Sequence, residues 1–431
     1  MIRTAVIGGG AAGFFLAVNL KEMMPEMEVT IFERSSKVLA KVEVSGGGRC
    51  NCTNSFAEVR DLQQVYPRGH RLLKRLFKGF DHQDAYAWFE QHGVPLVTQD
   101  DECVFPKAQD SHAIIDCFLR LAVQYHVNIE KNHKIDALSQ LEDYDYIAVT
   151  TGGSPRGEGL RWLEAMGHEV VSPVPSLFTF TINDPQLTSL MGLVVEDAVA
   201  HIPGTKLQGE GPLLITHWGM SGPAILKLSS QAARLLAEAG YQMPLSIRWT
   251  PLKESEVQEV LQETAIREPQ KLLGTFSPIA LPQRLWAYLT EKALGARSKI
   301  RWMELNKKDM NRLVNTLAND IYQIAGRSVF KDEFVTCGGV ALGSVNPATL
   351  ESRAVPHLYF AGEVLDIDGV TGGFNFQAAW TTAYTVAKSI VTTNCRQDMT
   401  KWHTKTNWHH SCIWLGESRK AIKKKNNMCN K

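Results

Sequence analysis

The chain has 431 residues, of which 44% are hydrophobic, and a formal net charge of +1. This length predicts two or three domains rather than one core, and the balanced charge excludes a protein whose whole surface is built to bind polyanions. Eight cysteines with no Cys-x-x-Cys pair exclude a disulfide framework and favour a reducing cytoplasm. No uninterrupted apolar stretch is long enough to cross a bilayer, so we expect no membrane partner.

The beginning of the chain has the pattern of a strand, a tight glycine turn and a helix. A short apolar run ends in GGGAAG, and the spacing Gly8-x-Gly10-x-x-Gly13 matches the dinucleotide-binding fingerprint. There the first glycine permits the turn, the second lets the backbone approach a pyrophosphate, and the third lets the helix pack on the strand. A second predicted strand, residues 28–33, ends in Glu33, where a carboxylate can bind a ribose. We predict the ADP-binding half of a Rossmann-like domain; a glycine-rich turn of another α/β protein is the alternative.

Residues 45–54, SGGGRCNCTN, predict a loop whose backbone lies against a planar or anionic group. Arg49 can neutralise a phosphate there, and Ser45 and Asn51 can supply hydrogen bonds to it or to a flavin ring. Cys50, beside Arg49, is a candidate redox thiol, although packing is the favoured role because the other cysteine of this loop is too close in the chain to be its partner. A flexible surface loop is the alternative interpretation.

The middle of the chain changes its pattern twice. Two prolines around one residue, at 173–175, mark the end of the first domain. Polar and apolar residues then alternate to about residue 250, which predicts a β-rich insert, and residues 251–330 have helical patterns. His217 and Ser221 lie at a predicted strand-to-helix junction inside the insert. Both are candidate catalytic or substrate-contacting residues, and a satisfied structural histidine is the alternative.

After residue 330 the sequence returns to the first domain. Residues 358–366 predict the last strand of its sheet, which contains Gly362 and Glu363, and residues 368–379 open a helix whose first N–H groups can face a flavin edge. An NAD-only dehydrogenase does not need this return, so FAD is the predicted cofactor. No second glycine fingerprint is present, so NAD(P)H is expected to bind briefly in the substrate cleft.

Three of these segments, GGGAAG, SGGGRCNCTN and TGGFNFQAAW, resemble the BaiN/YhiN-type family of bacterial FAD-dependent oxidoreductases, over roughly residues 1–392. The resemblance implies an α/β fold with a Rossmann-like FAD-binding domain of the two-dinucleotide-fold type. It places Thr151, Gly152 and Gly153 near the FAD adenosine, and Glu363 where many FAD proteins have an aspartate. It also implies an NAD(P)H-driven reductase, because members are linked to the reduction of ring double bonds in bile-acid-type steroids and in a uridine of large-subunit ribosomal RNA.

The motifs and the resemblance together assign the site residues. His217, Ser221 and Cys50 are the catalytic candidates, and no metal site is expected. The residues assigned to FAD are Gly8, Gly10, Ala11, Ala12, Gly13, Glu33, Arg34, Lys41, Ser45, Gly46, Gly47, Arg49, Cys50, Asn51, Thr151, Gly152, Gly153, Gly362, Glu363, Gly372, Gly373, Phe374 and Asn375.

The predicted domain boundaries follow from these patterns. Residues 1–175 and 331–392 form a discontinuous FAD-binding domain, residues 176–250 the β-rich insert and residues 251–330 a helical subdomain. Residues 393–431 are expected to form a basic tail that is disordered or loosely attached. The histidines and cysteine of this tail fit no strong zinc pattern.

Clusters of positive charge suggest a nucleic-acid partner. Arg71, Lys74, Arg75 and Lys78 share one face of a predicted helix and, with the tail, are candidates for contact with ribosomal RNA, although a solvated face is the plainer interpretation. Further cations lie between residues 299 and 312. A small-molecule ene-reductase or amine oxidase and a non-enzymatic flavin-binding protein remain the alternatives, and the oligomeric state is open.

Overall fold

The computed structural model describes residues 1–327 and 335–402, with side chains as far as residue 395. Its first domain is built on a five-stranded sheet of order β16-β7-β1-β2-β6, in which every neighbouring pair is parallel. The strands are β1 (Arg3–Ile7), β2 (Glu28–Glu33), β6 (Asn128–Lys131), β7 (Tyr146–Val149) and β16 (Leu358–Phe360). Strands β1, β2, β7 and β16 are mostly buried, as expected for a parallel sheet with helices on its faces.

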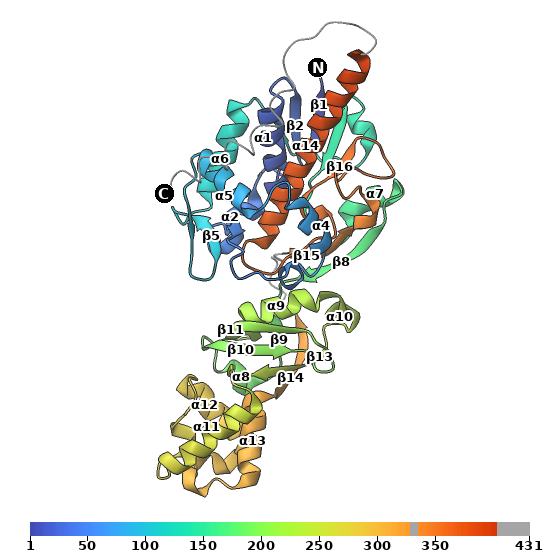
Figure 1. The fold of residues 1–431 in the computed structure, drawn as a ribbon. Coiled ribbons are helices and arrows are strands. Elements are labelled where there is room, and N and C mark those ends of the chain that lie inside the picture. The colour runs from blue at the N-terminus through green and yellow to red at the C-terminus, as the bar shows by residue number, and fades with distance from the viewer. Residues whose placement is uncertain (328–334, 403–431) are drawn as a thin grey trace.

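Two long-range partners, α1 (Ala11–Met23) and α14 (Phe374–Trp402), pack against each other beside this sheet. An aromatic cluster fills the space between them and α5 (His82–Gln91): the ring of Phe15 lies 4.6 Å from that of Trp88 and 5.1 Å from that of Trp380. The C-terminal part of the chain therefore completes this domain after the insert, which confirms the predicted return of the chain to the first domain (Figure 1).

Short elements cover the rest of this domain. They are α2 (Ala40–Val44), η1 (Ser45–Gly48), β3 (Thr53–Asn54), α3 (Leu62–Val65), α4 (His70–Leu76), α5 (His82–Gln91), β4 (Leu96–Thr98), β5 (Cys103–Pro106), α6 (His112–Gln124), η2 (Leu138–Leu141), η3 (Glu158–Leu160), α7 (Arg161–Ala165), η7 (Leu342–Ser344) and η8 (Gly362–Val364). Strands β3, β5 and β4 form a small sheet of that order. A two-stranded antiparallel ribbon of β8 (Val170–Ser176) and β15 (Val335–Val340) lies where the first domain meets the insert (Figure 1).

The insert begins with a closed barrel of six strands in the order β10-β11-β12-β9-β14-β13. Its strands are β9 (Phe180–Ile182), β10 (Val194–His201), β11 (Gln208–Thr216), β12 (Gly219–Ser221), β13 (Met243–Arg248) and β14 (Asp320–Arg327), and its helices are α8 (Pro185–Thr188), α9 (Pro223–Gln231) and α10 (Ala233–Glu238). The apolar side chains of Leu245 and Ile247 in β13 are fully buried, as expected for a barrel interior, and Ser246 between them is buried as well.

A helical subdomain is inserted between β13 and β14, at the end of the barrel away from the first domain (Figure 1). It contains α11 (Glu254–Arg267), η4 (Leu273–Thr275), α12 (Gln283–Leu294), η5 (Gly295–Lys299), η6 (Trp302–Glu304) and α13 (Lys307–Ala318). Its core holds two buried indoles, of Trp286 and Trp302, stacked at 6.3 Å. None of the helices in the described part of the chain combines the length and the hydropathy needed to cross a bilayer.

Two predicted boundaries are wrong. The helical segment was expected to reach residue 330, but β14 returns to the barrel at Asp320, and its first five residues alternate between buried and exposed. The tail was expected to begin at residue 393, but α14 continues to Trp402. Residues 403–431, which carry the rest of the predicted tail and its histidines, lie outside the described residues.

Candidate functional site

The glycine turn between β1 and α1 is closed on one side and open on the other. A Cβ atom on Gly13 would lie 2.0 Å from the carbonyl oxygen of Gly8, and one on Gly8 (φ +113°) would lie 2.6 Å from that of Thr150. Both positions therefore require glycine, because the backbone packs too closely for a side chain. A Cβ atom on Gly10 would meet nothing within 4 Å. The open side at Gly10, beside the start of α1, fits the approach of a pyrophosphate.

Glu33 lies at the carboxyl end of β2, directly beside this turn. One of its carboxylate oxygens accepts a hydrogen bond from the Gly9 N–H at 2.9 Å, and the other accepts from the backbone N–H and hydroxyl of Ser35 at 2.8 and 2.7 Å. These contacts fix the carboxylate where the sequence places the ribose. Arg34 follows it and is exposed, and of the two alanines that begin α1, Ala11 is half-buried and Ala12 is buried.

A second group of predicted residues meets at the end of β16. The Glu363 carboxylate accepts a hydrogen bond from Lys41 Nζ at 2.9 Å and another from the backbone N–H of Thr336 at 2.7 Å. A Cβ atom on Gly153 would lie 2.5 Å from the Thr336 hydroxyl. Residues from three distant parts of the chain thus surround one carboxylate.

Thr336 is a residue that sequence reasoning missed. Its side chain is buried, yet its hydroxyl oxygen has no hydrogen-bond partner among the described residues. A buried hydroxyl without a partner is costly, so it fits a position that contacts a bound molecule. The only signal in the sequence was that Thr336 lies two residues before the glycine pair at 338–339.

The 45–54 loop has the unusual backbone that its glycines predict. Gly46, Gly47 and Gly48 have φ values of +56°, +68° and +84°, and a Cβ atom on Gly47 would meet nothing within 4 Å. The polar side chains are turned elsewhere. Ser45 Oγ donates to the Val42 carbonyl at 2.7 Å, and the Arg49 guanidinium lies 4.2 Å from the Phe105 ring centre.

The proposal of redox chemistry at Cys50 is not supported by its surroundings. Its side chain is completely buried, and this burial raises the pKa of the thiol to about 12. A thiol with so high a pKa is almost entirely protonated near neutral pH and is a poor nucleophile. We therefore correct this assignment: Cys50 is a packing residue.

The beginning of α14 meets the 45–54 loop. A Cβ atom on Gly373 would lie 2.1 Å from the carbonyl oxygen of Thr53. In the amide orientation that satisfies its neighbours, Asn51 donates to Thr53 O at 2.9 Å and accepts from the Gly373 N–H at 3.2 Å. Asn375 bonds the backbone N–H and carbonyl of Gly369 at 2.8 and 2.9 Å. The predicted residues at 51 and 372–375 are therefore brought together.

Two residues not predicted from sequence also hold this loop. Asn54 Nδ2 donates to the carbonyl of Gly372 at 3.0 Å, and the Tyr66 hydroxyl donates to that of Phe374 at 2.8 Å. Both lie more than 300 residues before their partners. Asn54 ends the predicted 45–54 loop, although it was not itself assigned to the site, whereas no pattern in the sequence pointed to Tyr66.

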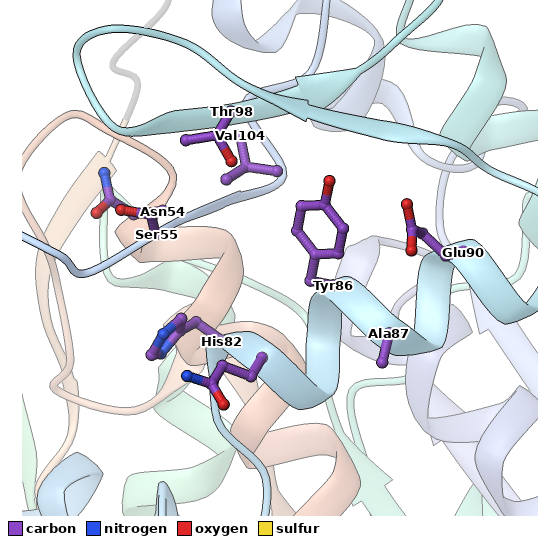
Figure 2. A pocket seen from close by; sticks show the side chains of 9 residues that line it. Asn54, Ser55, His82, Tyr86, Ala87, Glu90, Thr98 and Val104 are labelled. Carbon is purple, nitrogen blue, oxygen red and sulfur yellow. The ribbon is translucent and has the colours of Figure 1, made fainter. Parts of the chain in front are cut away.

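A groove of about 330 Å³ lies beside Asn54, between α5 and the β4–β5 hairpin (Figure 2). His82, Tyr86 and Glu90 line it from α5, opposite Thr98 and Val104. The His82 ring stacks on Phe56 at 4.7 Å, and partial burial lowers the pKa of this histidine, so it is neutral near pH 7. None of the residues predicted for the site lines this groove.

His217 and Ser221 lie in the barrel, at opposite ends of β12. His217 is exposed in the turn between β11 and β12, and its ring centre lies 4.1 Å from that of Trp218. Because β12 runs antiparallel to β9, which leaves the β8 ribbon, this turn lies at the barrel end remote from the first domain. The structure therefore does not bring His217 together with the predicted cofactor residues, whereas Ser221 lies at the nearer end.

The joint between the domains is a buried ion pair. Arg68 forms a bidentate pair with Asp368, and the side chains are 12% and 0% exposed. The third guanidinium nitrogen donates to the carbonyl of Ser230 in α9 at 2.7 Å, and the Ser176 hydroxyl donates to Asp368 at 2.9 Å. Burial raises the pKa of the Asp368 carboxyl, and Arg68 and Ser176 oppose that rise.

A second pair strengthens the joint. Arg234 in α10 donates to both carboxylate oxygens of Asp366 at 2.9 Å. Asp366 and Asp368 belong to the loop of residues 366–375, which ends in the glycine pair and Asn375. The insert is thus tied to the same loop that meets the 45–54 segment.

Comparison with known proteins identifies the family. Residues 2–389 match the family described as HI0933-like protein Rossmann domain. The chain belongs to this family of FAD-dependent oxidoreductases. The resemblance drawn from the motifs and the predicted fold class are both confirmed.

Two relatives align over nearly their whole length. The ribosomal RNA dihydrouridine synthase of Escherichia coli (strain K12) is 29% identical over 415 residues, covering 90% of this chain and 97% of the relative. The 3-dehydro-bile acid delta(4,6)-reductase of Clostridium scindens is 25% identical over 410 residues, covering 90% and 99%. Among solved structures, the FrdA chain of an E. coli quinol fumarate reductase is 12% identical with a TM-score of 0.44, over 99% of this chain and 74% of that one.

Proposed function

We propose that the protein is an FAD-dependent reductase that takes electrons from NAD(P)H and reduces a ring C=C bond, with a uridine of large-subunit ribosomal RNA as the candidate substrate and dihydrouridine as the product. The observation that carries the cofactor part is the convergence of glycine-bearing segments at 8–13, 151–153 and 362–375. The 29% sequence identity to the E. coli ribosomal RNA dihydrouridine synthase supports an RNA substrate. The identity to the bile acid reductase keeps a small-molecule enone as the second candidate.

The proposed roles of the cofactor residues follow their positions. The open side of Gly10 and the first N–H groups of α1 would face the pyrophosphate, and Glu33 would bind the adenosine ribose. Glu363, with Lys41 and Thr336, would line the path toward the flavin. FAD, when bound, supplies two-electron chemistry to the site.

At the flavin end of the site, the proposed contacts come from the two facing loops. The backbone at 46–47 and 372–373 would lie against the ring, since glycine there leaves no side chain in the way. The N-terminal N–H groups of α14 would stabilise negative charge at the ring edge. Asn54 and Tyr66 would act as positioning residues, because each holds a carbonyl of this loop.

The proposed RNA contact includes α4, and the proposed location is the cytoplasm, where ribosomes are assembled. Leu72, Leu73 and Leu76 of α4 are buried, while Arg71, Lys74 and Arg75 are exposed, as is Lys78 just beyond it. A row of cations on an exposed helix face suits contact with phosphates. The basic tail at 403–431 would add to this attraction.

The decisive experiment compares dihydrouridine in large-subunit ribosomal RNA from cells with and without the gene, by mass spectrometry of nuclease digests. Loss of one dihydrouridine on deletion, and its return with the wild-type gene but not with Gly13→Ala, is the expected result. Unchanged dihydrouridine would overturn the RNA substrate and turn attention to the enone.

A second measurement separates the classes of flavoprotein. Anaerobic addition of NADH or NADPH to the purified yellow protein should bleach the flavin absorbance at a rate consistent with turnover. No bleaching by either reductant would leave a flavin-binding protein without this activity. Rapid peroxide formation with an amine and oxygen would instead favour an oxidase.

A further inference from the structure

The helical subdomain carries exposed cations that no carboxylate of the described residues contacts. Lys299, Lys307, Lys308 and Arg312 are all exposed, and none has a hydrogen bond, ion pair or ring contact in the described part of the chain. Lys308 and Arg312 are four residues apart on α13, so they lie on the same face of that helix. We call these four residues the α13 patch.

Some cations of the same subdomain have carboxylate partners, whereas Lys253 and Arg267, at the two ends of α11, are exposed and have none among the described residues. Lys292 contacts Asp320 at 2.6 Å, and Lys271 contacts Glu268 at 3.2 Å. The acidic residues of α11 do not neutralise the patch either. They lie on a different helix, and none of them contacts a patch residue within the described part of the chain. The patch differs from these single cations because it brings four of them into one short stretch, residues 299–312.

An ion pair with a buried carboxylate places Lys299 near the start of α13. Arg297 Nε donates to the Asp309 carboxylate at 2.8 Å, and the Asp309 side chain is only 5% exposed. This pair fixes η5, which ends at Lys299, against the first turn of α13. It also uses the one carboxylate that lies between Lys308 and Arg312 in the sequence.

The patch works against the stability of its own helix. Lys307 and Lys308 occupy the first turn of α13, where the helix dipole is positive and a cation is unfavourable. Asn306 already caps this end, since its side chain accepts from the Asp309 N–H at 2.9 Å. Two lysines there make no contribution to folding that the structure records, which points to a role in binding.

We propose that the α13 patch binds the phosphate backbone of the substrate RNA, at a distance from the nucleotide that reacts. This inference rests on the proposed function and adds a second contact surface to it. The subdomain lies at the far end of the barrel from the first domain (Figure 1), so only a large, folded substrate can reach both. A small ring compound or a free nucleoside would not touch the patch.

The test replaces all four patch residues with glutamine and measures binding to a transcribed fragment of large-subunit ribosomal RNA over a range of salt concentrations. For the patch variant, the slope of log K against log[salt] should be smaller in magnitude than the wild-type slope by roughly 3–4. This is close to one for each phosphate that is no longer neutralised by a cation. Binding near physiological salt should weaken roughly 10- to 100-fold. The melting temperature should stay the same or rise, because two unfavourable charges have been removed from the helix start.

A matched control carries Lys107→Gln, Lys131→Gln, Arg161→Gln and Lys206→Gln, four exposed cations outside the helical subdomain. It has the same net charge as the patch variant and should keep the wild-type slope within about one, because its cations make no shared surface. If both variants show the same decrease in slope, the effect is one of overall charge and the patch proposal is wrong. If neither shows a decrease, the proposal is also wrong.

Failure of the patch and failure of the proposed function give different results. The patch variant should retain wild-type bleaching of the flavin by NAD(P)H while forming dihydrouridine in the fragment at least 10-fold more slowly at subsaturating RNA. A patch variant with unchanged dihydrouridine formation would overturn the inference alone. A wild-type protein that binds the fragment through the patch but forms no dihydrouridine would overturn the proposed reaction and leave the RNA-binding surface standing.

Discussion

Replacing Arg68 with methionine tests whether the joint is as important as its burial indicates. The change keeps an unbranched side chain but removes the partner of a carboxylate that is 0% exposed. It also leaves the Ser230 carbonyl without its donor, and among the described residues the Ser176 hydroxyl is then the remaining side-chain donor to Asp368. Breaking a buried ion pair from one side costs about 3–5 kcal/mol, so we expect the free energy of unfolding to fall by that amount.

The loss of stability should depend on pH. Burial already raises the pKa of Asp368, and removing Arg68 takes away the main influence that opposes it, so the folded-state pKa rises further. Below the unfolded pKa of about 3.9 the carboxyl is protonated in both states, and the variant is destabilised least. As the pH rises toward the folded pKa, the unfolded state gives up its proton first. The destabilisation therefore grows as the pH is raised from the acidic range to neutrality.

The assay is urea unfolding followed by tryptophan fluorescence at several pH values. Arg234→Met is the matched control: its partner is Asp366, but its side chain is 44% exposed, so we expect the free energy of unfolding to fall by about 1 kcal/mol or less. Arg68→Met combined with Asp368→Leu should recover much of the stability, because no buried charge remains. A decrease below about 1 kcal/mol for Arg68→Met, unchanged with pH, would refute the reasoning.

Three further predictions concern the cofactor site. Gly10→Ala should leave the melting temperature of the apoprotein unchanged and weaken FAD binding roughly tenfold or more. Gly13→Ala should lower the melting temperature as well as the affinity for FAD, since its Cβ would lie 2.0 Å from a carbonyl oxygen. If differential scanning fluorimetry and FAD titration show the same changes for the two variants, the prediction is wrong. Thr336→Val should keep the fold and weaken FAD binding roughly five- to tenfold, because the hydroxyl has no partner among the described residues to lose; unchanged affinity would remove Thr336 from the site. The Cys50 thiol should resist a thiol-specific disulfide reagent at mildly alkaline pH until the protein is unfolded, given its pKa of about 12, and Cys50→Ala should retain flavin bleaching; rapid labelling of the folded protein at Cys50 would contradict both.

Features carried by neighbouring residues could be predicted from the sequence. The strand, turn and helix at 3–23 need only a contiguous glycine pattern, and Glu33 follows from the length of one helix and one strand. The return to the sheet near residue 358 could be predicted because glycine motifs at both ends of the chain bind one cofactor in proteins of this kind. Each of these signals is local or belongs to a known motif.

Features that depend on distant partners could not be predicted. Strand β14 looks like part of a helical region until its pairing with β9 and β13 is known, and those strands lie more than 70 residues earlier. Arg68 and Asp368 are 300 residues apart, so neither has a local pattern that marks it as paired. The redox hypothesis for Cys50 failed because it relied on a neighbour in the chain. Arg49 precedes Cys50, yet its guanidinium lies on the Phe105 ring, and the thiol is buried in an apolar core.

The joint has a consequence for how the insert and the cofactor site communicate. The loop at 366–375 is held from the first domain through Asn54 and Tyr66, and from the insert through Arg234 and the Arg68–Ser230 contact. A rotation of the barrel that kept both ion pairs would pull on the backbone that leads to Gly372. A rotation that broke them would expose the buried carboxylate of Asp368. We therefore expect a substrate that moves the insert to act on the proposed flavin contacts as well, through this one loop.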